Sequence, residues 1–180
     1  MFALKVVGLD EANQLICNNW PTHIISLMET RPEFDRDYGA HHLHIAVADV
    51  PYVTQHVVSP QLKHLLSVLD FTKDLTDADR LLVHCFAGMS RSTSTAIGIL
   101  IQHNLSYLDA FAKVQEVRQC LMPNELFIQH IDAHFDLDNK LVEHVKAHRQ
   151  QTIGLLTTGP TQADINATKA MLGLLDRLKK

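Results

Sequence analysis

The sequence predicts an α/β fold in which a central mixed or parallel sheet is flanked by helices and followed by a helical C-terminal extension. Two observations predict the sheet. Apolar, β-branched runs near the start of the chain are separated by a helical stretch, and strand, helix and strand in succession are typical of such sheets. Further on, Leu81, Leu82 and Val83 have the composition of a buried strand and lead, past Ser90, into a core helix. A chain of 180 residues suits one domain with a substantial core.

The first part of the chain predicts three strands with a helix between the first two. The strands are expected at residues 2–7, 23–28 and 41–47. Asp10 is the expected N-cap of a helix that ends near residue 18. Alternation along the third strand puts His42 and His44 on one face. A structural zinc site needs four ligands, and no further ligand pattern accompanies these two histidines. We therefore expect no metal and no cofactor.

The connection from the third strand to the centre of the chain predicts one more helix. From Ser59 to Phe71 the leucines recur at helical spacing, with Ser59 as the expected N-cap and Pro60 at the first helical position. A polar connection over residues 72–80 then returns the chain to the strand at 81–83. This helix is expected to support the sheet.

A short motif follows that strand and reads His84-Cys85-Phe86-Ala87-Gly88-Met89-Ser90-Arg91-Ser92. The first backbone N–H groups of the next helix have no internal partner and bind anions readily. Gly88 lets the amides of residues 86–91 converge, and Arg91 adds a planar charged fork suited to phosphate oxygens. The same positive field favours the thiolate form of Cys85. Alone, Cys85 could be a small buried hydrophobe and Arg91 a surface charge, but the full pattern is far more restrictive.

Cleavage of a phosphate ester also needs an acid that protonates the departing oxygen. Asp49 follows the third strand directly and precedes Cys85 by 36 positions, so its carboxyl is expected beside the anion site. The alternative is an ordinary turn aspartate. Asp70 and Asp74 are weaker candidates because they belong to the next helix and its exit. We assign Asp49 as the general acid.

The motif resembles that of the cysteine-dependent protein tyrosine phosphatases, in particular their dual-specificity branch. The resemblance implies a protein tyrosine phosphatase-like fold, in which Ser92 donates a hydrogen bond to the departing sulfur and His84 orients the loop. It also implies that Asn124 holds the phosphate loop from behind, although a plain helix N-cap is an equal alternative.

The loops at residues 29–39 and 49–55 would frame the substrate in such a fold. Arg31, Phe34 and Arg36 are then specificity contacts, with a solvated polar loop as the alternative.

The expected activity is phosphomonoester hydrolysis without a metal, through a phosphocysteine intermediate. The expected substrate is a protein that carries phosphotyrosine, phosphoserine or phosphothreonine. Two alternatives stay open: a module that binds phosphoproteins without turnover, and a rhodanese-like sulfur or arsenate enzyme.

The remainder of the chain predicts helices. They are expected at residues 91–103, from Ser106, and after Asn124. The resemblance extends to about residue 138, and we assign residues 1–157 to the catalytic domain. A break at Thr158-Gly159-Pro160 precedes an amphipathic helix within 158–180. That helix is expected to pack on the domain or, alternatively, to contact a second copy or another partner.

Composition excludes several classes of protein. The formal charge of -4 and the pI near 6.3 give no basic footprint for nucleic acid. No apolar run reaches about eighteen residues, and no basic leader opens the chain, so we expect neither a membrane span nor export. Three cysteines without framework spacing, one of them a proposed thiolate, fit a reducing compartment. We therefore expect a cytoplasmic protein.

Overall fold

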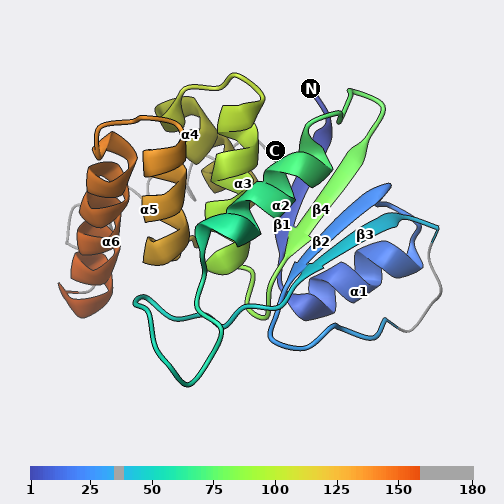
Figure 1. Ribbon diagram of the computed structural model, residues 1–180, viewed down its shortest axis with the longest axis horizontal. Coiled ribbons are helices and arrows are strands. Elements are labelled where there is room, and N and C mark those ends of the chain that lie inside the picture. The colour runs from blue at the N-terminus through green and yellow to red at the C-terminus, as the bar shows by residue number, and fades with distance from the viewer. Residues whose placement is uncertain (35–38, 159–180) are drawn as a thin grey trace, which may run out of the picture. The chain divides into compact units, whose positions relative to one another are not determined.

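A computed structural model describes residues 1–34 and 39–158, and its centre is a parallel sheet (Figure 1). The four strands are β1 (Ala3–Val7), β2 (His23–Leu27), β3 (His41–Ile45) and β4 (Arg80–His84). Their order across the sheet is β1-β4-β2-β3, and every pair is parallel. The predicted α/β fold is confirmed, with a sheet that is wholly parallel in the described part of the chain.

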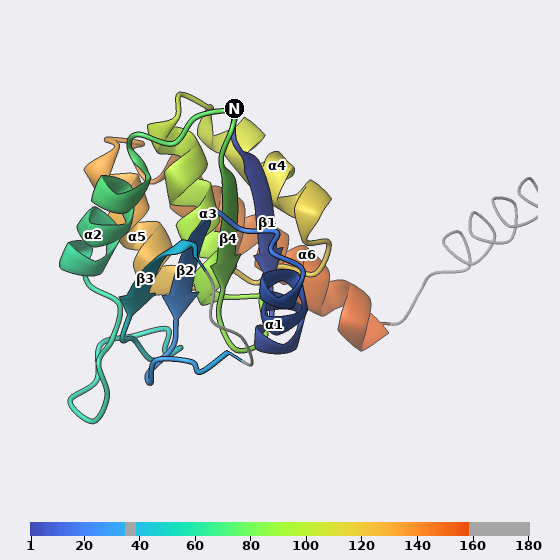
Figure 2. The same ribbon diagram turned by 90° about the vertical axis from the view of Figure 1, so that its right-hand side faces the viewer.

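Helices cover both faces of this sheet (Figures 1 and 2). Helix α1 (Leu9–Cys17) lies on one face, whereas α2 (Leu62–Thr72), α3 (Arg91–Gln102) and α4 (Tyr107–Val117) lie on the other. Helix α5 (Glu125–His134) packs on α2 and α3. None of the helices in the described ranges combines the length and apolar character needed to cross a membrane.

Two compact units divide at Glu143 and His144, within helix α6 (Lys140–Thr158). Helix α6 ends at Thr158, the first residue of the break predicted at 158–160. The amphipathic helix predicted within 158–180, with its proposed contact to a partner, lies outside the described residues apart from Thr158.

The central strands β2 and β4 are buried on both faces because alternate side chains point to opposite helices. Ile24 of β2 and Leu82 of β4 pack with Ala12 and Ile16 on the α1 side. The intervening residues of the same strands, which include Ile25 and Val83, are fully buried and point to the opposite face. This packing fixes β4 in the interior of the sheet, and with it the position of the motif that follows.

Two of the predicted helix starts are wrong. Gly8, not Asp10, is the N-cap of α1, because the Leu9 N–H is bonded to the Phe86 carbonyl at 3.0 Å and starts the helix earlier. Helix α2 begins at Leu62 after Gln61, since the Ser59 hydroxyl accepts a hydrogen bond from the Thr54 N–H instead of capping the helix.

The predicted caps at Ser106 and Asn124 are confirmed. The Ser106 side chain accepts a hydrogen bond from the N–H of Asp109 at 3.1 Å, and the Asn124 side chain accepts one from Phe127 at 3.2 Å. Each cap satisfies one of the backbone donors that open a helix.

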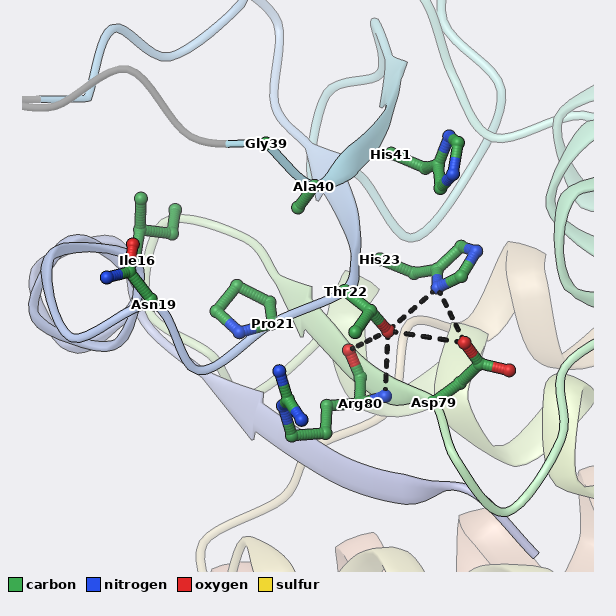
Figure 3. Close-up of a pocket in the computed structure, with 10 residues that line it drawn as sticks. All are labelled: Ile16, Asn19, Pro21, Thr22, His23, Gly39, Ala40, His41, Asp79 and Arg80. Carbon is green, nitrogen blue, oxygen red and sulfur yellow. Dashed lines mark hydrogen bonds and ion pairs between the residues drawn. The ribbon is translucent and has the colours of Figure 1, made fainter.

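A cavity of about 430 Å³ lies at the edge of the sheet where the strands begin (Figure 3). Its polar side chains bond mainly to one another: the Thr22 hydroxyl accepts the Arg80 N–H at 2.8 Å, and His23 lies 3.6 Å from Asp79. None of the motif residues lines this cavity. These bonds join the segments that lead into β2 and β4. The motif lies at the opposite edge of the sheet, where the strands end.

Candidate active site

The motif forms a loop between the end of β4 and the start of α3, as predicted. Cys85 is fully buried at the base of this loop. Its Sγ atom accepts the Gly88 N–H at 3.2 Å and lies 3.3 Å from the Ser92 Oγ atom. The Cys85 side chain therefore lies between the backbone of the loop and the first turn of α3.

Gly88 gives the loop its sharp turn. Its φ angle is 73°, and a Cβ atom there would lie 2.3 Å from the Val7 carbonyl carbon and 2.4 Å from the Gly8 nitrogen. Both are backbone atoms that cannot move aside, so a side chain does not fit. The loop therefore rests directly on the end of β1.

Arg91 opens α3 and is almost completely buried. Its Nη1 atom donates to the Val47 carbonyl at 2.8 Å, and its Nε atom lies 3.6 Å from the Asp49 Oδ2 atom. A guanidinium has five N–H donors, so the bond to Val47 fixes its plane while other donors stay available to an anion. The segment after β3 thus orients Arg91 in the loop.

Asp49 comes from a distant part of the sequence and lies against the same loop. Its Oδ1 atom accepts hydrogen bonds from the Ser90 hydroxyl at 2.7 Å and from the Asn124 side-chain amide at 3.0 Å. The rival carboxylate Asp70 lies on α2, where it pairs with Lys73 at 2.7 Å in an exposed position. Of these two carboxylates, the geometry favours Asp49.

Asn124 performs the capping role and adds a contact that differs from the prediction. Its side chain donates to Asp49 and to the Val50 carbonyl, both at 3.0 Å. The residue thus holds the segment that carries Asp49, whereas the sequence placed it behind the phosphate loop. Its own N–H donates to Ser94 of α3 at 2.6 Å, which ties it to the helix that Arg91 opens.

Further supports of the loop come from the segment after α4 and were missed from the sequence. The Arg118 Nη2 atom donates to the Ala87 carbonyl at 3.0 Å, while its Nη1 atom pairs with Glu11 at 2.9 Å. The Met122 N–H donates to the Met89 carbonyl at 2.8 Å. These bonds join residues far apart in the chain, so no local sequence pattern predicts them.

A cavity of about 490 Å³ opens in front of the loop. It is lined by Met28, Glu29, Thr30, Asp49, Phe86, Ala87 and Arg91. Of these residues, Phe86 is a large apolar side chain that is 69% exposed. The cavity therefore borders the part of the loop that carries Phe86, Ala87 and Arg91.

The predicted specificity contacts lie elsewhere or outside the described residues. Phe34 and Arg31 do not line the cavity. The Phe34 ring contacts His84, at 5.6 Å between ring centroids, and an Arg31 nitrogen lies 3.4 Å from a nitrogen of His42. Arg36 falls in the gap of the described ranges. The segment after β2 therefore contributes Glu29 and Thr30 to the cavity, and Phe34 to the floor beneath the motif.

A buried histidine, His84, and a half-buried one, His42, form a polar group under the loop. The Ser26 Oγ atom lies 2.6 Å from the His84 Nε2 atom and 2.7 Å from the His42 Nε2 atom. Burial lowers the pKa of His84 to about 4, against the opposing effect of the Cys85 backbone. Burial, together with the nearby Arg31 charge, also lowers the pKa of His42 to about 4. Both rings are therefore neutral at pH 7.

We expect the free energy of unfolding to fall as the pH drops from about 6.5 towards 4. An unfolded histidine binds a proton near pH 6.5 but folded His84 only near pH 4, so acid favours the unfolded chain. The stabilisation lost through His84 is about 2 kcal/mol at pH 5 and about 3 kcal/mol below pH 4. Urea unfolding at about pH 7.5 and pH 5 measures it.

The matched controls for this pH effect are two substitutions. His84→Gln should reduce the slope by the contribution of His84 and leave that of His42, while His56→Gln, in an exposed loop, should leave the slope unchanged. A wild-type slope in His84→Gln would contradict the assignment.

Known proteins resemble this chain in sequence over most of the described residues. The family described as "Dual specificity phosphatase, catalytic domain" matches residues 12–136. A probable dual specificity protein phosphatase of Dictyostelium discoideum is 32% identical over 112 residues, which is 61% of this chain and 26% of that protein. Dual specificity protein phosphatase 15 of Homo sapiens is 32% identical over 113 residues, which is 62% of this chain and 36% of that protein. The chain thus spans about a quarter to a third of the length of these relatives.

Solved structures share the fold. The crystal structure of DUSP15 superposes with a TM-score of 0.59 at 25% identity, covering 82% of this chain and 92% of that one. The crystal structure of human DUSP28 gives a TM-score of 0.61 at 22% identity, covering 74% of this chain and 92% of that one. Both superpositions show that the overall fold is one already seen in solved structures.

Proposed function

Because the chain belongs to the family of dual specificity phosphatase catalytic domains, we propose that it hydrolyses phosphomonoesters on proteins through a phosphocysteine intermediate. The observation that carries this proposal is that two side chains from distant parts of the sequence, Cys85 and Asp49, lie at one loop. Arg91 lies close to Asp49 and next to the cavity in front. A thiolate, an acid and a phosphate cradle are what such a hydrolysis requires.

In the first step the Cys85 sulfur attacks phosphorus, and the bond between phosphorus and the ester oxygen breaks. Protonated Asp49 gives its proton to the departing oxygen, which leaves as an alcohol or phenol. Arg91 and the backbone amides of residues 86–91 hold the other three oxygens through the transition state. The cradle is therefore formed by Phe86, Ala87, Gly88, Met89, Ser90 and Arg91.

In the second step a water molecule attacks the phosphocysteine. The Asp49 carboxylate accepts a proton from this water. The water oxygen forms a bond to phosphorus, and the bond between phosphorus and sulfur breaks. The Ser92 hydroxyl, 3.3 Å from the sulfur, donates a hydrogen bond to the thiolate that departs. Inorganic phosphate leaves, and Cys85 and Asp49 are ready for another cycle.

The substrate is proposed to be a phosphorylated protein in a reducing compartment, the cytoplasm, because a working thiolate must stay reduced. Phosphotyrosine, phosphoserine and phosphothreonine all fit the proposal. A nucleic acid or membrane partner has no support in the charge or the apolar pattern of the sequence.

A second candidate function is recognition of phosphoproteins without turnover. Its support is the 30% identity, over 86 residues, to the serine/threonine/tyrosine-interacting protein of Homo sapiens, which covers 44% of this chain and 39% of that protein. The cradle alone would suffice for binding. A pure binder has no need for a thiolate and an acid at one loop, so hydrolysis remains the proposal.

Turnover of an aryl phosphate by the purified protein tests hydrolysis directly. We expect release of the phenol with saturation kinetics in buffer that contains EDTA, because Arg91 and the amides supply the positive charge. Binding of a phosphopeptide without any phenol or phosphate release would instead favour the recognition module. Thiosulfate-dependent conversion of cyanide without phosphatase activity would favour the rhodanese-like alternative.

A further inference from the structure

Three polar side chains from adjacent strands meet on the α1 face of the sheet, directly beneath the motif. They are Ser26 of β2, His42 of β3 and His84 of β4. Ser26 and His84 are opposite each other in the strand register, and both are fully buried. The Ser26 oxygen bonds to the Nε2 atom of each histidine, at 2.6 Å for His84 and 2.7 Å for His42. The three side chains therefore form one continuous hydrogen-bonded chain.

The direction of these hydrogen bonds follows from Arg31. Its guanidinium can only donate, and its Nη2 atom lies 3.4 Å from the His42 Nδ1 atom, so Nδ1 is the acceptor. A neutral His42 then has its proton on Nε2 and donates it to the Ser26 oxygen. The single hydroxyl proton of Ser26 is left to donate to the His84 Nε2 atom. The reverse direction would turn a His42 N–H towards the Arg31 donors.

His84 must consequently have its proton on Nδ1. Within the described part of the chain, this atom is buried beside the backbone of Cys85 and has no hydrogen bond of normal geometry. The ring edge is covered by Phe34 at 5.6 Å between centroids. An N–H dipole next to the Cys85 peptide favours negative charge on that residue and fixes the first peptide of the cradle.

We propose that Ser26 and His42 are positioning residues for Cys85, which act by fixing His84 in the tautomer with its proton on Nδ1. Their catalytic consequence rests on the proposed function, but the tautomer itself does not. Arg31, in the loop that follows β2, sets the donor-to-acceptor direction of these hydrogen bonds. The two histidines on this face of β3 therefore have different roles. His42 bonds to Ser26, whereas the His44 Nε2 atom bonds to the Met28 carbonyl at 2.9 Å.

Nitrogen NMR of uniformly ¹⁵N-labelled full-length protein at about pH 7 tests the tautomer without any need for turnover. Two-bond ¹H–¹⁵N correlations distinguish a protonated ring nitrogen from one that only accepts. We expect His84 to show the Nδ1–H pattern and His42 the Nε2–H pattern. An Nε2–H pattern for His84 would overturn the proposal.

The pH dependence of Cys85 alkylation by iodoacetamide tests the effect on the nucleophile. Ser26→Ala and His42→Leu should each move the midpoint of the rate profile up by about one pH unit, because the fixed N–H dipole is lost. His42→Gln keeps an amide donor near the Nε2 position and should restore most of the wild-type midpoint. His44→Gln, on the same face of β3, is the matched control and should not move it.

An unchanged midpoint in both folded Ser26→Ala and folded His42→Leu would overturn the role in positioning. The alkylation rate and the NMR pattern are measured without substrate. Failure of this proposal is therefore distinguishable from failure of the phosphatase proposal, which would appear as an absent aryl phosphate turnover with both readouts as expected.

Discussion

Replacing Cys85 with serine should abolish aryl phosphate turnover, with kcat lowered by about 10⁴-fold or more, because no other group at the loop can form the covalent intermediate. A hydroxyl is far less ionised than a thiol in the same place, and the Ser92 hydroxyl on α3 lies 3.3 Å from the sulfur position. The amides and Arg91 are untouched by the change. Steady-state kinetics should therefore show lost turnover, while phosphopeptide binding measured by calorimetry persists.

Cys120→Ser is the matched control for this experiment, since Cys120 is exposed and far from the loop in sequence. It should leave kcat within about twofold of wild type, as expected for a surface substitution. Substantial turnover in Cys85→Ser would exclude the phosphocysteine mechanism. Trapping of a phosphorylated Cys85 in wild type by rapid acid quench would provide the positive counterpart.

Asp49→Asn should lower kcat by about 10²–10⁴-fold, the usual contribution of a positioned acid. Asparagine can still accept the hydrogen bonds of Ser90 and Asn124 through its carbonyl oxygen, so the segment should stay in place. The loss should be greatest for alkyl phosphates, whose leaving oxygen needs the proton most. The measurement is kcat for a series of leaving groups, with KM changed little.

Asp70→Asn tests the rival assignment under the same conditions. Asp70 pairs with Lys73 on the exposed side of α2, and its neutralisation should not affect kcat. An Asp49→Asn enzyme with the leaving-group dependence of wild type would contradict the role of Asp49 as the acid.

The parts of the site that were predictable are those in which chemistry and sequence are adjacent. The strand at 81–83, the loop and the helix that starts at Arg91 follow one another within a dozen residues, so composition and spacing were enough. The position of Asp49 at the loop was predictable because this residue comes shortly after a recognisable strand, which ends at Ile45 and not at the predicted residue 47.

Contacts between distant segments were not predictable in the same way. Alternation placed His42 on the same face as His44. That Ser26 is the partner of His42 depends on which strand lies beside β3 and in which register, and the sequence does not show either. The same holds for Arg118, whose bond to Ala87 depends on where α4 ends. The prediction of where α1 begins was wrong for a related reason, since a hydrogen bond between Leu9 and Phe86 outweighs the capping preference of Asp10.

The strand order has a consequence for how the candidate site is assembled during synthesis. Strand β4 is the last of the four in the sequence, yet it occupies the interior of the sheet between β1 and β2. Until β4 has left the ribosome, β1 has no strand to pair with, and only β2 and β3 can associate. The nucleophile and the backbone on which its loop rests thus come together in one folding event. A chain that ends before β4 therefore has no assembled candidate site, because Cys85 and the loop follow that strand.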